Sequence, residues 1–206
     1  MGKLFTVCEW ITKLAYLNIL WMVYIAAGLF IFGFMPASAA LFVVIRKVLK
    51  KESDIPIWRT FHTAYKQEFI KSNIAGLFLL LIGIIIILDY WLLQYAMGVM
   101  RGIMAGLLLL LSVFYITVLV FFFPVYVHYD LKLRDYFKYA LLLGISHLHV
   151  AAVIFILTAL TVFLLLYMPG LIPFFGGISL AYLWMTGGVY IFRIMEERGR
   201  KILSVC

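Results

Sequence analysis

Ionisable side chains within apolar stretches are the first candidates for chemistry, because a charged group inside a membrane is costly and commonly marks a functional site. The sequence contains three: Asp89 near the end of one apolar stretch, and His147 and His149 in another. We interpret Asp89 as a carboxylate at the membrane surface that pairs with Arg101. Two histidines that are two residues apart point to different faces of a helix, so they do not chelate one metal ion together.

Other reactive groups are scattered singly along the chain. The sequence has no nucleophile elbow, phosphate-binding glycine loop, HExxH motif or pair of carboxylates at catalytic spacing. Its two cysteines, Cys8 and Cys206, lie near opposite ends and lack metal-ligand spacing. We therefore expect no enzyme activity, no cofactor and no bound metal ion.

The composition indicates what surrounds these few polar groups. Of the 206 residues, 67% are hydrophobic and 13% are charged, whereas about 25% of the residues in a soluble domain are charged. Lipid has to cover the excess of apolar surface. The net charge of +8 comes from clusters between apolar stretches rather than from a basic stripe with interleaved aromatic residues, so we expect no nucleic-acid partner.

Five apolar stretches are long enough to cross a bilayer as helices, which takes about 20 residues each. They span residues 14–34, 74–93, 103–127, 141–167 and 171–192. Their apolar residues are continuous, which favours helices over alternating strands. The sequence therefore predicts an all-α, polytopic membrane helix bundle with about five transmembrane helices, in a single membrane domain over residues 1–206.

The segment between the first two stretches, residues 36–73, is basic and amphipathic. Apolar residues recur there at helical spacing, first after Pro36 and again around Phe61. We expect one or two interfacial helices whose basic side faces anionic headgroups on the cytoplasmic side. Packing of these apolar faces on the protein's own bundle is an equal alternative. The candidate interaction surface consists of Arg46, Lys47, Lys50, Lys51, Arg59, Lys66 and Lys71.

Basic residues also predict the orientation, because loops rich in Lys and Arg stay in the cytoplasm. With five crossings, 14 basic residues lie on one side, and only Lys3, Lys13 and Arg101 lie on the other. This distribution predicts an external N-terminus and a cytoplasmic C-terminus.

Two further patterns concern packing. Gly98, Gly102 and Gly106 recur every four residues, which permits close approach between helices. We expect them to pack inside the monomer, with a homodimer as the alternative. A second pattern suggests a duplication of helical hairpins, in which one copy contains Pro36 and Phe61 and the other contains Pro124 and Phe137.

Several short runs, taken in order and spacing, carry a resemblance to a known family. They are Asn18-Ile19-Leu20-Trp21, Gly33-Phe34-Met35-Pro36-Ala37-Ser38-Ala39-Ala40-Leu41, Arg46-Lys47, the pair Phe61 and Phe69, Phe123-Pro124, Tyr139-Ala140-Leu141-Leu142 and His147-Leu148. On these runs nearly the whole chain resembles the YesL-like family of bacterial membrane proteins, although Met35 stands where the family typically has a small residue. The resemblance implies a bacterial cell membrane, mainly of Gram-positive bacteria, and an association with carbohydrate uptake and polysaccharide utilisation. It implies no reaction.

Two functions fit these observations. The first is an accessory or regulatory membrane component that partners a membrane protein of a carbohydrate uptake system. The alternative is a transporter or facilitator of a small neutral solute such as a sugar, which needs no buried charge but needs polar residues along its path. The candidates for that path are Asn18, Ser112, Thr117, Ser146, Thr158, Thr161 and Thr186.

Overall fold

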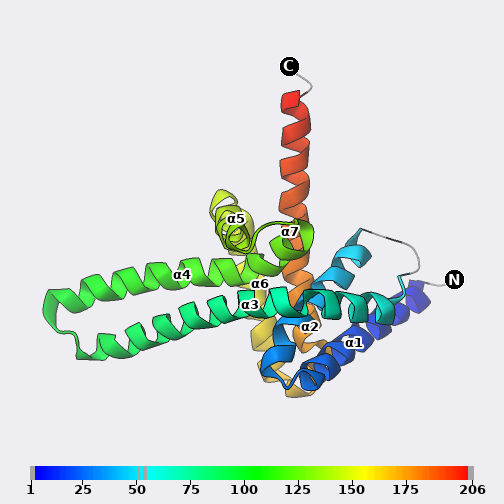
Figure 1. The fold of residues 1–206 in the computed structure, drawn as a ribbon, viewed down its shortest axis with the longest axis horizontal. Coiled ribbons are helices and arrows are strands. Elements are labelled where there is room, and N and C mark those ends of the chain that lie inside the picture. The colour runs from blue at the N-terminus through cyan, green and yellow to red at the C-terminus, as the bar shows by residue number, and fades with distance from the viewer. Residues whose placement is uncertain (1–2, 51, 53–54, 204–206) are drawn as a thin grey trace.

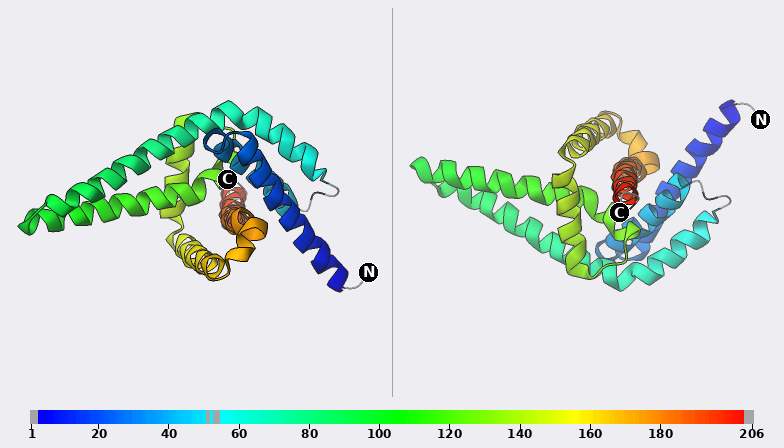
Figure 2. Two further views of the ribbon diagram at one scale, coloured as in Figure 1. Left: turned by 90° about the horizontal axis from the view of Figure 1, so that it is seen from below. Right: turned by 90° about the horizontal axis from the view of Figure 1, so that it is seen from above.

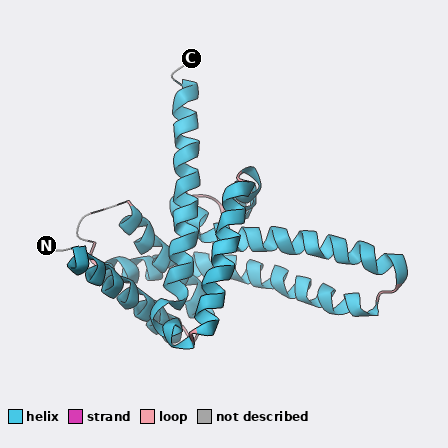
Figure 3. Cartoon of the chain, turned by 180° about the vertical axis from the view of Figure 1, so that it is seen from behind, coloured by secondary structure: helices cyan, strands magenta, loops and turns pink. Residues whose placement is uncertain are grey.

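A computed structural model describes residues 3–50, 52 and 55–203, and this part of the chain is almost entirely helical (Figures 1 and 3). Two short 3-10 helices, η1 and η2, join longer helices. The elements are α1 (Lys3–Ala27), α2 (Ile31–Leu49), α3 (Ile57–Leu92), η1 (Leu93–Tyr95), α4 (Gly98–His128), α5 (Leu133–Ser146), α6 (Leu148–Tyr167), η2 (Pro169–Leu171) and α7 (Ile172–Leu203). The prediction of an all-α helix bundle is confirmed.

Within the described part, six helical segments are long and apolar enough to cross a membrane, which indicates a multi-pass membrane protein. They are Cys8–Ala27, Ile31–Leu49, Ile57–Tyr95, Gly98–His128, Leu148–Tyr167 and Pro169–Glu197. The sixth segment arises at the start of the chain. The predicted stretch 14–34 is divided there, because α1 ends at Ala27 and α2 begins at Ile31.

The turn between α1 and α2 depends on close backbone contact. Leu29 and Phe30 adopt the left-handed region, with φ of 57° and 61°, which costs a non-glycine residue about 1–2 kcal/mol. A Cβ atom at Gly33 would lie 2.8 Å from the carbonyl oxygen of Tyr24 and 2.9 Å from the Cα of Ile25. Only glycine permits this approach of the two helices.

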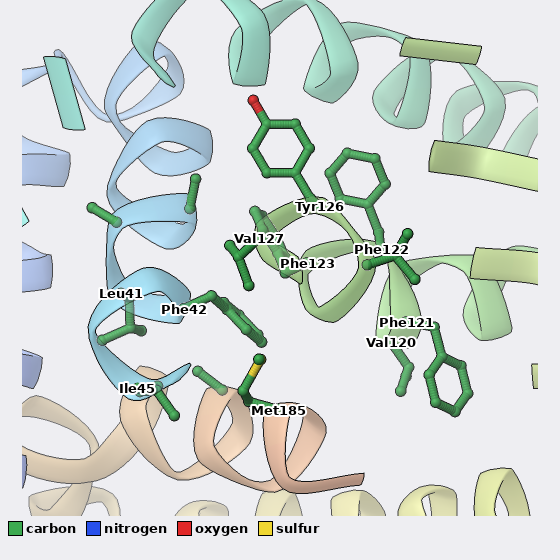
Figure 4. Packing of buried hydrophobic residues seen from close by; sticks show 14 of the residues in the cluster. Leu41, Phe42, Ile45, Val120, Phe121, Phe122, Phe123, Tyr126, Val127 and Met185 are labelled. Atoms are coloured by element: carbon green, nitrogen blue, oxygen red, sulfur yellow. The ribbon is translucent and has the colours of Figure 1, made fainter. Parts of the chain in front are cut away.

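Helix α2 packs in the centre of the bundle, so residues 36–49 follow the second of the two alternatives predicted for them. Residues 36–42 are buried on all sides. Figure 4 shows Leu41, Phe42 and Ile45 of α2 among side chains from α4 and α7. The Phe42 ring stacks on Phe123 of α4, with centroids 4.9 Å apart.

A proline within α2 is accommodated by a neighbouring helix. Pro36 has no N–H to donate, which leaves the carbonyl of Phe32 without its usual helical partner. The side-chain amide of Asn73, on α3, donates to that carbonyl at 2.9 Å. Phe61 is fully buried near the start of α3, so the second amphipathic pattern in 36–73 forms the beginning of a long helix.

The remaining helices form two hairpins, α3–α4 and α6–α7, which are joined by α5. Helices α3 and α4 make a long hairpin whose tip projects away from the other helices, and the last turns of α7 project in another direction (Figures 1 and 2).

Residues 141–167 do not form one helix, because α5 ends at Ser146 and the backbone breaks at His147, with φ −128° and ψ 52°. Pro124 lies inside α4 and Phe137 lies on the short helix α5, so the second copy of the proposed duplication lacks a counterpart to the long α3.

The glycine series near the tip of the hairpin is open. Apart from its chain neighbours and the backbone of its own helix, a Cβ atom at Gly98, Gly102 or Gly106 would have no described atom within 4 Å. The expectation that these glycines pack inside the monomer is therefore wrong. Other glycines do mark close crossings: a Cβ atom at Gly188 of α7 would lie 2.6 Å from the Cβ of Pro124 in α4.

Candidate functional site

Four helices meet around a polar pocket of about 320 Å³. Helix α2 contributes one wall, α3 another, and the end of α4 with the following loop and α5 completes the pocket. The lining consists of Val43, Arg46, Glu68, Lys71, Tyr126, Val127, His128, Tyr129, Asp130 and Tyr136. Its size is at the lower end of the range for small-ligand sites, about 300–1,000 Å³.

A carboxylate on α3 is held by a phenol on α4. The hydroxyl of Tyr126 donates to Oε2 of Glu68 at 2.5 Å, a length typical of charge-assisted hydrogen bonds. The Tyr126 ring is buried and stacks on Phe122, with centroids 5.5 Å apart. Among the residues that the structure describes, no Lys, Arg or His nitrogen lies within 4.0 Å of the Glu68 carboxylate. Glu68 therefore presents a negative charge that a hydrogen bond stabilises but no cation neutralises.

Lys71, one turn further along α3, is positioned mainly by a tyrosine. Its Nζ donates to the hydroxyl of Tyr136 at 3.0 Å and to Oδ1 of Asp130 at 3.3 Å, and it lies 5.1 Å from the centre of the Tyr136 ring. The Asp130 side chain is fully exposed, and an ion pair in water contributes little to stability. Tyr136 is the firmer anchor, because it is buried.

The same phenol fixes the loop that borders the pocket. The Tyr136 hydroxyl accepts the backbone N–H of Leu131 at 3.0 Å and contacts the carbonyl of Tyr129 at 3.2 Å as a donor. Burial raises the pKa of the Tyr129 phenol, and the nearby Glu196 and Tyr139 raise it further. Tyr129 is therefore a neutral hydrogen-bonding group at physiological pH.

Arg46 reaches from α2 to the end of α4. Its guanidinium donates to the carbonyl of Val127, one of the last-turn carbonyls that have no partner within their own helix. The negative end of the helix dipole also favours a cation there. No carboxylate lies within 4.0 Å of Arg46 in the described part of the chain. The pocket thus contains one unpaired cation and one unpaired anion.

His128 closes the pocket on the side of α7. Its ring stacks on Phe192 with centroids 4.0 Å apart, and its Nδ1 atom is buried without a hydrogen-bond partner among the described atoms. Packing against α7 therefore fixes this side chain, which is half-buried.

The structure brings together two of the seven residues of the predicted interaction surface. Arg46 and Lys71 line the pocket, Lys47 lies 4.0 Å from Glu52, and Lys51 lies outside the described residues. The other three are exposed and do not line the pocket: Lys50, Arg59 and Lys66.

Sequence reasoning missed Glu68, although a signal was available. It is the single acidic residue between residues 55 and 88, and it lies three residues before Lys71, which places both on one helical face. Tyr126 and Tyr136 were interpretable from the sequence only as interfacial aromatics, because their partners come from other helices.

The other predicted polar residues have separate surroundings. Asp89 lines a small pocket with apolar residues, and the expected ion pair with Arg101 is not formed in the described structure. His147 is buried and His149 is exposed, with ring centroids 6.3 Å apart. No group of three potential metal ligands occurs among the described residues.

Most hydroxyls proposed for a transport path are bonded within the bundle. Thr158 accepts a hydrogen bond from the indole N–H of Trp184 at 3.0 Å. The others with a described bond donate to the carbonyl four residues earlier in their own helix: Ser112, Thr117, Thr161 and Thr186. None of these hydroxyls lines the polar pocket.

Asn18 joins the first helix to the last. Its Oδ1 accepts the backbone N–H groups of Gly177 and Ile178 at 3.0 and 2.9 Å, and its Nδ2 donates to the carbonyl of Pro173 at 2.7 Å. The side chain is fully buried. Asn18 is therefore a structural link between α1 and α7 with its amide already satisfied.

Several known proteins are similar to this chain over most of its length. The family model described as "Protein of unknown function, DUF624" matches residues 14–90. The uncharacterized protein YteU of Bacillus subtilis (strain 168) is 37% identical over 97% of this chain and 89% of its own length. From the same organism, YesV is 36% identical over 84% of this chain and 83% of its own length, and YesL is 29% identical over 94% and 91%. No solved structure matches the chain. The chain belongs to the DUF624 family, the YesL-like proteins of unknown function.

Proposed function

We propose that this protein is an accessory or regulatory component of the bacterial cell membrane, without catalytic activity, that assists a carbohydrate uptake or utilisation system. The supporting observation is the pocket between α2, α3, α4 and α5, in which charged and polar side chains from four helices meet. The hydroxyls required by the alternative, a transporter of a neutral solute, are mostly occupied by hydrogen bonds within the bundle. The carbohydrate context rests on the resemblance to the YesL-like family.

The exposed cations Lys50, Arg59 and Lys66 are the surface that we assign to a partner membrane protein. They are close to the pocket in sequence, and none of them forms an ion pair within residues 3–50, 52 and 55–203. Exposed basic residues also suit the anionic headgroups of the cytoplasmic leaflet, so an experiment has to separate partner binding from attraction to lipid.

We expect the triple variant Lys50→Gln, Arg59→Gln, Lys66→Gln to lose its partner. The measurement is recovery of an uptake-system permease or ATPase after affinity purification from native membranes in mild detergent. The matched control removes three other exposed positive charges, at Lys132, Lys138 and Arg193, and should retain the partner while reducing lipid attraction equally. Failure to recover such a protein with the wild type, or equal losses in both variants, would contradict the proposal.

We further propose that both termini are cytoplasmic. Six crossings by the segments of the structure, instead of the five predicted from the sequence, bring the N-terminus to the same side as the C-terminus. Of the 17 Lys and Arg residues, only Arg101 then lies at an external turn. Five crossings leave Lys3, Lys13 and Arg101 outside, so the six-crossing arrangement follows the positive-inside rule more closely.

The native cysteines allow a direct test of this orientation. In a Cys206→Ser variant, Cys8 is the remaining thiol and is exposed. We expect a membrane-impermeant maleimide to leave Cys8 unlabelled in intact cells and to label it after permeabilisation. Met97→Cys, in a variant without either native cysteine, is the external control, because Met97 lies at the tip of the α3–α4 hairpin and is 85% exposed. Labelling of Cys8 in intact cells would contradict this proposal and support the external N-terminus predicted from the sequence.

A further inference from the structure

The charges that line the polar pocket balance each other. Arg46 and Lys71 contribute two positive charges, and Glu68 and Asp130 contribute two negative charges. Lys71 is bonded to Asp130, which leaves Arg46 and Glu68 without ionic partners. A ligand that carries an anionic and a cationic group together matches this lining better than a purely anionic one.

An apolar groove lies beside the polar pocket, between two of the same helices. It has a volume of about 190 Å³ and is lined by Phe78 and Ile82 of α3 and by Leu133, Arg134 and Phe137 of α5. Tyr136 of the polar pocket is followed directly by Phe137 of the groove. Along α3, Lys71 and Phe78 are seven residues apart, which corresponds to about 10 Å.

The walls of the groove and the pocket share a buried aromatic ring, that of Phe122. Phe122 packs against Tyr126 of the pocket, with centroids 5.5 Å apart, and against Phe137 of the groove, with centroids 5.4 Å apart. A polar cavity with both charges and an adjoining apolar groove form one amphipathic surface. A soluble metabolite would use the first part and leave the second part empty.

We propose that these two cavities together bind a phospholipid with a phosphoethanolamine headgroup. The phosphate lies against Arg46 and Lys71, and the guanidinium presents several donors in a geometry suited to phosphate oxygens. The ammonium lies against Glu68. An acyl chain follows the groove at Phe78 and Phe137. This site goes beyond the accessory role proposed above and does not depend on the identity of a protein partner.

The location at the end of α4 supports a lipid ligand. Helix α4 is apolar over most of its length, and the polar pocket begins at its last turn, with Tyr126 and the loop at Asp130. In a membrane helix this change of polarity marks the boundary between hydrocarbon and headgroups. A lipid beside the hairpin therefore has its headgroup at the depth of the pocket.

The test is native mass spectrometry of the purified full-length protein with equimolar dioleoyl phosphatidylethanolamine and dioleoyl phosphatidylglycerol. We expect the wild type to retain the ethanolamine lipid about tenfold more than the glycerol lipid, because one charge-assisted contact corresponds to at least a tenfold difference in affinity. Glu68→Gln should remove this preference, since the amide still accepts the Tyr126 hydrogen bond but carries no charge. Arg46→Gln should weaken retention of both lipids.

Three further samples test the groove, the source of the headgroup and the specificity of the charge change. Phe137→Ser should lower retention of phosphatidylethanolamine, because it changes the groove for the acyl chain. Soluble glycerophosphoethanolamine, which has the headgroup but no acyl chains, should bind neither the variant nor the wild type appreciably. Glu197→Gln makes the same chemical change as Glu68→Gln on an exposed residue of α7 that lines neither cavity, so it is the control and should behave as the wild type. Equal retention of the two lipids by the wild type, an unchanged preference in Glu68→Gln, or tight binding of glycerophosphoethanolamine would overturn the proposal.

Discussion

Replacing Asn18 with leucine is expected to lower the free energy of unfolding by about 2–4 kcal/mol, because each buried donor or acceptor left without a partner costs about 1–3 kcal/mol. The amide of Asn18 accepts from Gly177 and Ile178 and donates to Pro173. Leucine has a similar volume and suits an apolar core, so lost packing contributes little. Helix α7 can recover part of the loss by closing its own backbone bonds, which sets the upper limit.

The measurement is unfolding of the detergent-solubilised protein by increasing fractions of a denaturing detergent. Asn18→Asp keeps the acceptor and removes the donor, and it places a charge in a buried position, so it should also destabilise. Gln94→Leu is the matched control, because this amide is exposed at the tip of the α3–α4 hairpin, and it should leave the transition unchanged. A wild-type transition for Asn18→Leu would show that the link between α1 and α7 contributes nothing to stability.

Gly33→Ala is expected to destabilise the protein by about 1–3 kcal/mol, the usual cost of forcing extra volume into a packed core. The added methyl group would meet the backbone of α1, at the carbonyl of Tyr24 and the Cα of Ile25, rather than a side chain that can rotate away. The helices α1 and α2 would have to move apart. The same unfolding assay measures this effect.

Gly106→Ala makes the same chemical change in open surroundings. Beyond the backbone of its own helix and its chain neighbours, no described atom lies within 4 Å of the added methyl group. Because alanine also restricts the unfolded chain, this variant should be about 0.4–1 kcal/mol more stable than the wild type. The two substitutions should therefore shift stability in opposite directions. Equal effects would mean that the α1–α2 crossing is looser than the structure has it.

The sequence predicted the helical architecture well, and it failed where a helix is interrupted without a polar signal. Residues 14–34 are apolar throughout, so length alone suggested one crossing. The break at Leu29 and Phe30 depends on Gly28 and Gly33, whose role requires knowledge of which backbones approach each other. Likewise, α5 and α6 are separated at His147, where neither proline nor glycine marks the end. Hydropathy indicates that a segment can enter a membrane, but it does not indicate where a helix within that segment is interrupted.

The candidate site was predictable in part. Arg46 and Lys71 belong to the basic set recognised from the sequence, because clusters of cations beside apolar stretches are conspicuous in it. Glu68, Tyr126 and Tyr136 complete the pocket from α3, α4 and α5, and their proximity follows from tertiary packing over separations of 58 and 65 residues. The distribution of Lys and Arg along the sequence indicated which segments are polar. Which individual groups pair with one another could be known only from the three-dimensional structure.

The amide link between α1 and α7 also bears on biosynthesis. Asn18 leaves the ribosome 159 residues before Gly177, which corresponds to about 8–30 s of translation at 5–20 residues per second. During that interval the first helix carries an unsatisfied amide, and its native partner does not yet exist. Packing of α1 is therefore incomplete until α7 is made, and a nascent chain that ends before α7 keeps the Asn18 amide without its native partners.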